Sequence, residues 1–242
     1  MNDTIIEANN ILKTYDTGKI KVHALRGVNL KVNRGEMVAI MGPSGCGKTT
    51  LLNCLSGLDD INNGSILIDG IDLSKLSDAK RTEFRSKRMG FVFQTYNLLP
   101  VLSSIENIEL PLLVAGTPLK EARIKAARVL EQVHLSEWAQ HKPAELSGGQ
   151  RQRITIARAL VNEPAIVWGD EPTGDLDSMN ANEIIDLMVN LNRRSGQTFV
   201  LVTHDANIAN RTDRIIYMTD GLIVNEKITE QGQQRRSRTD KA

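Results

Sequence analysis

Short apolar runs separated by polar and glycine-containing segments recur along the chain and predict a sheet. Val28, Leu30 and Val32 alternate with polar residues, as in a half-buried strand, whereas 37–41 is a continuous apolar run typical of a central parallel strand. Helical patterns lie between several later runs, which favours an α/β chain. The later runs are 66–68, 91–93, 165–168 and 199–202.

The two ends of this pattern differ from its middle. Near the end, the runs 215–218 and 222–224 flank Asp220-Gly221, which suits the positive φ angles of a tight antiparallel hairpin. Between about 96 and 160 strand signals are scarce and helix signals dominate. We therefore expect an inserted helical subdomain there.

The composition is that of an ordinary folded protein with no large charge excess. Among 242 residues, 30 Lys and Arg offset 29 Asp and Glu, so the net charge of +1 argues against a broad basic face for nucleic acid, and no nucleic-acid partner is expected. No secretory leader and no apolar stretch of about 18 residues is present, so we expect no membrane span. Only Cys46 and Cys54 could form a disulfide, which favours a reducing cytosol.

A glycine-rich segment after the central strand carries the strongest chemical signal. Residues 42–49 fit the pattern G-x-x-x-x-G-K-[ST] between a predicted strand and a predicted helix, the P-loop arrangement. Backbone N–H groups and the helix N-terminus would cradle phosphates, Lys48 would reach the terminal phosphates, and Thr49 would bind Mg²⁺. A plain glycine turn would not require the lysine and hydroxyl. The expected nucleotide contacts are Gly42, Pro43, Ser44, Gly45, Cys46, Gly47, Lys48, Thr49 and Thr50.

Two carboxylates follow a later apolar strand. Asp170 and Glu171 come after 165–168, at the sheet edge where ligands gather in open α/β sheets. Asp170 is predicted to face Mg²⁺, and Glu171, pointing elsewhere because side chains alternate, is predicted to be the general base for an attacking water. Taken alone, the pair could be a solvated acidic strand end.

A second glycine-containing turn precedes another predicted helix. Leu146-Ser147-Gly148-Gly149-Gln150 could be an anion cradle at a helix N-terminus or an ordinary serine N-cap. One chain thus has two phosphate-binding turns but one P-loop lysine and one Asp-Glu pair. We infer that each nucleotide is held by unlike halves of two chains. The expected contacts from this turn are Ser147, Gly148, Gly149 and Gln150.

The order of these motifs resembles the ATP-binding cassette (ABC) ATPases over nearly the whole chain, since Gln94 follows an apolar strand and His204 lies in Thr203-His204-Asp205. The resemblance implies that Tyr15 stacks on adenine, that Gln94 touches Mg²⁺ and the attacking water, and that His204 holds the γ-phosphate and orients Glu171. It also implies that 174–177 senses the partner's site. Without that context, Tyr15 would more often be a packing residue and His204 an ordinary strand-end histidine.

The resemblance also implies a domain organisation. We expect one ABC ATPase domain over 1–228, with a P-loop NTPase core of mixed sheet flanked by helices (about 1–95 and 161–228), the helical subdomain (about 96–160) and an antiparallel β region. The stretch 229–242 has little apolar surface and is predicted to be a flexible polar tail. Contact of that tail with anionic lipid is the less favoured alternative.

Segments 91–100, 106–111 and 170–174 are similar to the ATPases of the lipoprotein-release and macrolide-export group. The resemblance implies ATP and Mg²⁺ as cofactors, a homodimer with ATP bound, and a permease that holds the chain at the inner face of the cell membrane. The alternative is a soluble ABC ATPase that acts on ribosomes or DNA. The apolar residues that could dock the permease, or else fill the core of the helical subdomain, are Tyr96, Leu98, Leu99 and Val101.

Two residues depart from the family pattern. Trp168 is bulkier than the aliphatic residue expected before the carboxylates, and Arg151 replaces a frequent glutamine. Neither change removes a catalytic group, so we expect effects on local packing and nucleotide affinity only.

Overall fold

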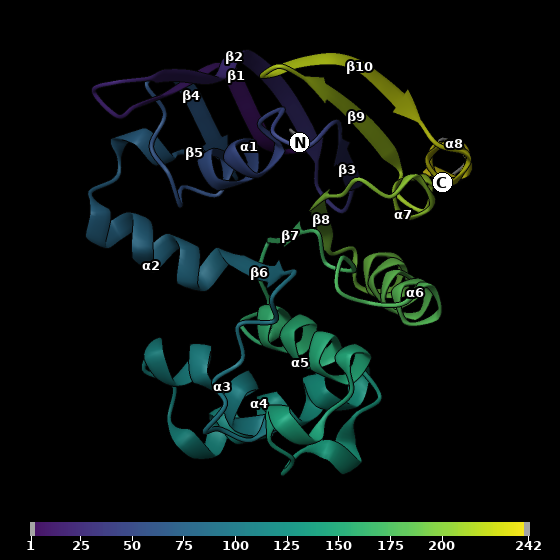
Figure 1. Cartoon of the computed structure of the whole chain (residues 1–242). Helices are drawn as coiled ribbons and strands as arrows, with labels where there is room; N and C mark the ends of the chain where they lie inside the picture. The colour runs from purple at the N-terminus through teal and green to yellow at the C-terminus, as the bar shows by residue number, and fades with distance from the viewer. Residues whose placement is uncertain (1–2, 240–242) are drawn as a thin grey trace.

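The computed structural model describes residues 3–239, and in this part of the chain the strands form two sheets (Figure 1). The smaller sheet is antiparallel and has the order β2-β1-β4-β5. Its strands are β1 (Thr4–Asp16), β2 (Lys21–Asn33), β4 (Asn63–Ile68) and β5 (Ile71–Asp72).

The larger sheet has six strands in the order β10-β9-β3-β8-β7-β6. All neighbouring pairs from β9 to β6 are parallel, and β10 alone runs antiparallel to its neighbour β9. Its strands are β3 (Met37–Met41), β6 (Met89–Phe93), β7 (Ile166–Asp170), β8 (Thr198–Val202), β9 (Arg214–Thr219) and β10 (Leu222–Ile228). The predicted α/β class with a mixed sheet and an antiparallel region is confirmed.

The continuous apolar runs arise because both faces of the larger sheet are covered. In β7, Val167 belongs to the core shared with the helices below, whereas Ile166 and Trp168 belong to the core beneath the antiparallel sheet. All three side chains are fully buried. The sheet therefore separates two hydrophobic cores.

Helices cover both faces of this sheet and build the lower lobe in Figure 1. Between β6 and β7 the described elements are all helical, and the lobe begins with a capping box in which Ser103 and Glu106 bond each other's backbone N–H groups. Arg123 and the nearly buried Glu109 form an ion pair with an Nε–Oε2 distance of 2.6 Å that joins α3 to α4. The lobe helices are α3 (Ser104–Val114), α4 (Leu119–Gln132), α5 (Gly148–Leu160) and the 3-10 turns η2 (Ser136–Trp138) and η3 (Pro143–Glu145).

The remaining helices pack around the sheets. Ile184, Leu187 and Met188 of α6 are buried, as their helical spacing in the sequence requires. None of the helices within 3–239 is long and apolar enough to cross a membrane. These helices are α1 (Lys48–Leu55), η1 (Leu73–Lys75), α2 (Asp78–Arg88), α6 (Ser178–Ser195) and α7 (Ala206–Asn210).

The end of the chain differs from the sequence prediction. Where a flexible polar tail is predicted over 229–242, the structure has helix α8 over Glu230–Thr239, and 240–242 lie outside the described residues. The Thr229 hydroxyl accepts from the Gly232 N–H at 3.1 Å, and Arg235 donates to Asp213 at 2.8 Å. Polar contacts hold this helix, so the scarcity of apolar residues was a misleading signal.

One glycine permits the close approach of the lobe to the sheet. A Cβ atom at Gly90 would lie 2.2 Å from the carbonyl oxygen of Ala159 in α5. Gly90→Ala should therefore lower the free energy of unfolding by about 1–3 kcal/mol through overpacking, measured by urea denaturation. An unchanged midpoint would show that β6 and α5 can separate without cost.

Candidate functional site

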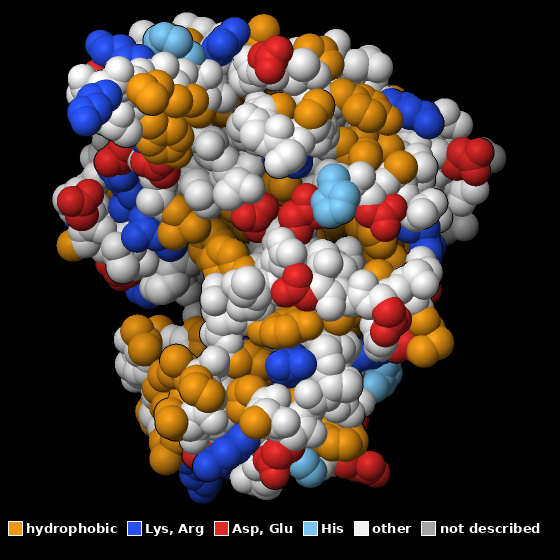
Figure 2. Space-filling view, viewed as in Figure 1, with side chains coloured by type: hydrophobic (Ala, Val, Ile, Leu, Met, Phe, Trp, Pro, Cys, Tyr) orange, Lys and Arg blue, Asp and Glu red, His pale blue; other side chains and the backbone are white. Residues whose placement is uncertain are grey.

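The predicted site residues follow the carboxyl ends of parallel strands. β3 leads into the P-loop, β7 ends at Asp170, and β8 leads to His204. Parallel strands place these ends at one edge of the sheet. Figure 2 shows acidic side chains beside a histidine near the centre of this face. The fold thus gathers segments that lie far apart in the sequence.

The P-loop glycines are required by close approaches of backbone. A Cβ at Gly42 would lie 2.2 Å from the Met218 carbonyl oxygen, and one at Gly47 would lie 2.5 Å from that of Ala24. Gly47 also has φ +103°, and α1 begins directly after it. Lys48 is 8% exposed, and its Nζ donates to the carbonyl oxygens of Gly42 and Pro43 at 2.9 and 3.0 Å. The ammonium group lies inside the loop, where an anion would be cradled.

Thr49 and Asp170 meet across the sheet edge. The threonine Oγ1 donates to Asp170 Oδ1 at 3.1 Å. Burial raises the pKa of Asp170, and repulsion from Glu171 adds to this, although the Thr49 hydrogen bond opposes it. The positive charge of Lys48 also opposes the rise. A hydroxyl and a carboxylate are suitable ligands for Mg²⁺, which takes few protein ligands when phosphates supply the rest. No group of three or more His, Cys, Asp or Glu within 3–239 forms a separate metal site.

Glu171 follows the last residue of β7, and its backbone leaves the extended conformation of the strand. Its φ is +47°, a left-handed conformation that is uncommon for a residue with a side chain. The Glu171 N–H donates to the Val202 carbonyl at 2.9 Å, which ties this turn to β8. His204 Nδ1 lies 3.0 Å from Glu171 Oε1. The predicted pairing of these two side chains is therefore present in the single chain.

Tyr15 faces a cleft of about 610 Å³ in front of the P-loop. Tyr15 is 40% exposed. The cleft also contains residues that the sequence did not predict. Val22 is the register partner of Tyr15 on β2, so the strand pairing was the signal that could have found it. Residues of the cleft outside the predicted set are Lys21, Val22, His23, Ala24, Arg26, Asp220 and Gly221.

Gln94 directly follows Phe93, the register partner of Asp170, and its side chain is bonded to a third segment. Its Nε2 donates to Asp175 Oδ1 at 2.7 Å, and Gly174 leaves the space that its side chain occupies. Asp175 belongs to the segment 174–177 that the sequence suggested as a sensor of the partner's site. In this structure Gln94 is bound to that segment.

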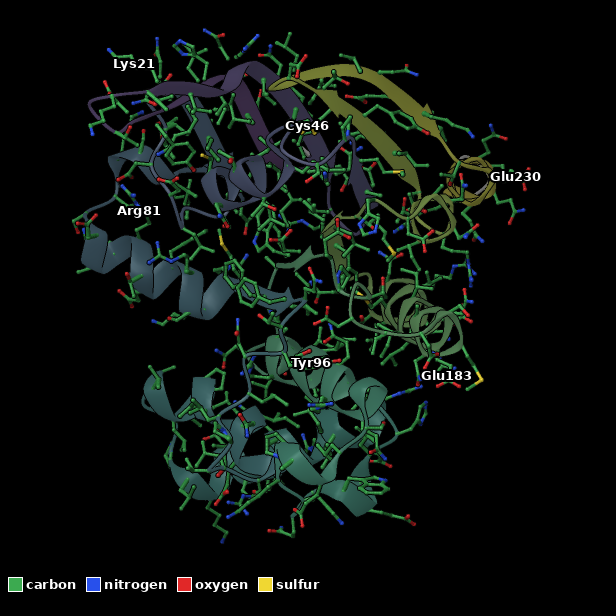
Figure 3. The ribbon with its side chains drawn as sticks, in the orientation of Figure 1. Lys21, Cys46, Arg81, Tyr96, Glu183 and Glu230 are labelled. Atoms are coloured by element: carbon green, nitrogen blue, oxygen red, sulfur yellow. The ribbon has the colours of Figure 1, made fainter. Side chains whose placement is uncertain are left out.

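The second glycine turn lies away from the cleft. None of the described residues that line the cleft comes from 146–150. Ser147 caps α5, with its Oγ accepting from the Gln150 N–H at 3.2 Å and its N–H donating to Gln150 Oε1 at 2.9 Å. Figure 3 shows Tyr96 beside α5, far along the molecule from Cys46 in the P-loop. Within one chain, therefore, Ser147 acts as an ordinary N-cap.

The two unusual residues both pack against other parts of the chain. Trp168 is fully buried in the core beneath the antiparallel sheet. The guanidinium of Arg151 lies 5.0 Å from the centroid of the Tyr96 ring, a cation–π contact between α5 and the segment after Gln94.

A family model, curated relatives and solved structures all match the chain as an ATP-binding cassette of the ABC transporter family. Residues 25–174 match the family model described as ABC transporter. The chain is 50% identical over 222 residues to the lipoprotein-releasing system ATP-binding protein LolD of Porphyromonas gingivalis, covering 92% of this chain and all of that protein, and 46% identical to LolD of Bacteroides fragilis, covering 91% and 100%. Among solved structures, the ATP-binding cassette MJ0796 in a dimeric post-hydrolysis state bound to ADP and Pi matches with a TM-score of 0.84, 44% identity, and 92% and 98% coverage.

Proposed function

The chain belongs to the ABC transporter family and is an ATP-binding, ATP-hydrolysing subunit of such a transporter, and we propose that its transporter is of the lipoprotein-releasing type. This proposal is supported by relatives at 45–50% identity that carry that name over almost their full length. A role on ribosomes or DNA, the alternative from the sequence, is not favoured by these relatives.

The separation of the cleft from 146–150 is the observation that carries the proposed mechanism. The P-loop, Glu171 and Tyr15 line one cleft, whereas Ser147 caps a helix elsewhere in the same chain. We infer that two copies join head to tail, so that Ser147 and Gly149 of each copy complete the site of the other. The dimeric MJ0796 structures, at 44% identity, support homodimerisation.

Each residue of the half-site has a proposed role. Lys48 and the P-loop N–H groups bind the phosphates, and Tyr15 stacks on the adenine. Thr49 and Asp170 would hold Mg²⁺, with Gln94 joining them after leaving Asp175. Bound there, Mg²⁺ would neutralise charge on the transferred phosphoryl group.

The catalytic step depends on Glu171 and His204. The carboxylate of Glu171 accepts a proton from the water that attacks the γ-phosphorus. The bond between the γ-phosphorus and the bridging oxygen breaks, and ADP leaves. His204 holds the carboxylate by the Nδ1–Oε1 contact and would contact the γ-phosphate. Hydrolysis removes the intact ATP that is bound by both copies at once, so the dimer opens.

A hydrophobic surface on the lower lobe supports permease docking. Half-buried Leu98 packs against the lobe core, whereas Leu99 and Val101 are 42% and 75% exposed. Val114 and Leu119 are also exposed, and Figure 2 shows hydrophobic side chains on the side of the lobe where Figure 1 places α3. A permease bound there would hold the chain at the inner face of the cell membrane.

Capture of the tagged chain from detergent-solubilised membranes tests this partner. We expect a permease with a large extracytoplasmic domain, identified by mass spectrometry, and Val101→Asp should reduce its recovery at least about tenfold by burying a charge. Val224→Asp, at a 59% exposed valine on β10, is the matched control. Recovery of ribosomal proteins or DNA in place of a permease would contradict the proposal.

A further inference from the structure

Tyr15, at the nucleotide cleft, is hydrogen-bonded to a partly buried ion pair between Lys13 and Asp59. Its hydroxyl donates to Asp59 Oδ2 at 2.7 Å. Lys13 Nζ donates to Asp59 Oδ1 and to the Asp60 carbonyl oxygen, both at 2.6 Å, and lies 4.8 Å from the centroid of the Tyr15 ring. One carboxylate therefore holds both the hydroxyl of the tyrosine and the ammonium group over its ring.

The pair is charged and lies outside the cleft. Burial is the largest single influence on each group and opposes its charge, but the hydrogen bond and the charge attraction between them together outweigh it. The pKa of Lys13 is therefore raised, and that of Asp59, which also accepts from Tyr15, is lowered. Lys13 is 8% exposed. The described residues that line the cleft include Tyr15 but neither Lys13 nor Asp59. Among the residues that line the cleft, Tyr15 is hydrogen-bonded to Asp59 and lies beneath the ammonium group of Lys13.

We propose that Asp59 and Lys13 are positioning residues that hold the Tyr15 ring ready to stack on the purine base. The inference rests on the proposed stacking of Tyr15 on adenine. It extends that role to two residues that do not touch the nucleotide.

Two physical effects favour this assignment. A tyrosine that is 40% exposed would otherwise lose rotational freedom when the base binds, so a ring fixed in advance reduces the entropic cost of binding. A cation at one ring face also draws electron density through the ring, which favours an electron-rich purine at the other face. The triphosphate contacts of the P-loop gain nothing from either effect.

The test compares a ligand with a base and one without. Binding of Mg-ATP and of Mg-tripolyphosphate to the full chain is measured by titration calorimetry for Asp59→Ala, Lys13→Met and Tyr15→Phe. Asp60→Ala is the matched control, because the Asp60 side chain is 77% exposed, pairs with Arg81, and offers only its backbone oxygen to Lys13.

We expect Asp59→Ala to weaken Mg-ATP binding about three- to tenfold, the scale of immobilising one side chain, with tripolyphosphate affinity unchanged. Lys13→Met and Tyr15→Phe should show the same selective loss, and Tyr15→Phe tests the link even if Asp59→Ala does not fold. In a Tyr15→Ala background, Asp59→Ala should have no further effect, since it acts through the ring. Asp60→Ala should bind both ligands normally.

Three results would overturn the inference. The first is an equal loss of tripolyphosphate binding in Asp59→Ala, which indicates a general structural defect. The second is a further loss of ATP binding when Asp59→Ala is added to Tyr15→Ala. The third is unchanged ATP binding in both Asp59→Ala and Tyr15→Phe. If Tyr15→Ala itself binds ATP normally, the stacking assignment under the proposed function fails, and this result is distinguishable from a failure of Asp59 and Lys13 alone.

Discussion

Glu171→Gln should lower the ATP turnover rate by about 10²- to 10⁴-fold, the usual effect of removing a general base, while ATP still binds. The amide has nearly the shape of the carboxylate but cannot accept a proton. Lys48 contacts the carbonyl oxygens of Gly42 and Pro43, which follow β3, whereas Glu171 follows β7. The substitution therefore leaves the P-loop contacts in place. Steady-state phosphate release and calorimetric ATP binding measure the two properties separately.

The control for this variant is Glu163→Gln, the same chemical change at an exposed residue outside the cleft. It should hydrolyse ATP at the wild-type rate. Wild-type turnover by Glu171→Gln would reject the assignment of the base. A parallel loss of ATP affinity would instead show that Glu171 acts in binding.

Much of the site could be predicted because it depends on local pattern and on topology. The P-loop at 42–49 is encoded by residues next to one another, and parallel strands bring their carboxyl ends to one edge wherever each strand lies in the sequence. Recognising β3, β7 and β8 from their apolar runs was therefore enough to place Lys48, Asp170 and His204 together.

Other features depend on contacts that no local pattern reveals. The prediction that Glu171 points away from Asp170 assumed strand alternation, but β7 ends at Asp170 and Glu171 has a positive φ. The contact between Gln94 and Asp175 joins segments 81 positions apart. Asp59, which lies 44 positions from Tyr15, carries no motif at all. Helix α8 was missed because it is held by hydrogen bonds rather than by apolar burial.

Ser147→Arg should lower ATP turnover by at least about 10²-fold, the scale of losing preorganised donors to the transferred phosphoryl group, although its own P-loop is intact. The arginine would place a bulky charge where Ser147 of one copy meets the nucleotide of the other. ATP affinity of the isolated chain should change little, because no described residue of 146–150 lines the cleft.

Ser147→Ala separates the loss of a helix cap from the steric effect. Both variants lose the hydrogen bond from the Gln150 N–H, which costs about 0.5–2 kcal/mol of stability, but only arginine adds bulk. Ser147→Ala should therefore form the dimer, seen by size-exclusion chromatography with ATP. Failure of both variants to dimerise would attribute the effect to the cap.

Combining Glu171→Gln with Ser147→Arg in one chain tests both assignments together. Glu171→Gln retains its ATP, so the closed dimer should accumulate, because bound ATP stabilises the state that binds it. Adding Ser147→Arg should return this dimer to a monomer that still binds ATP. A dimer in the double variant would place 146–150 outside the interface, and a monomeric Ser147→Arg chain with wild-type turnover would show that one copy holds a complete site.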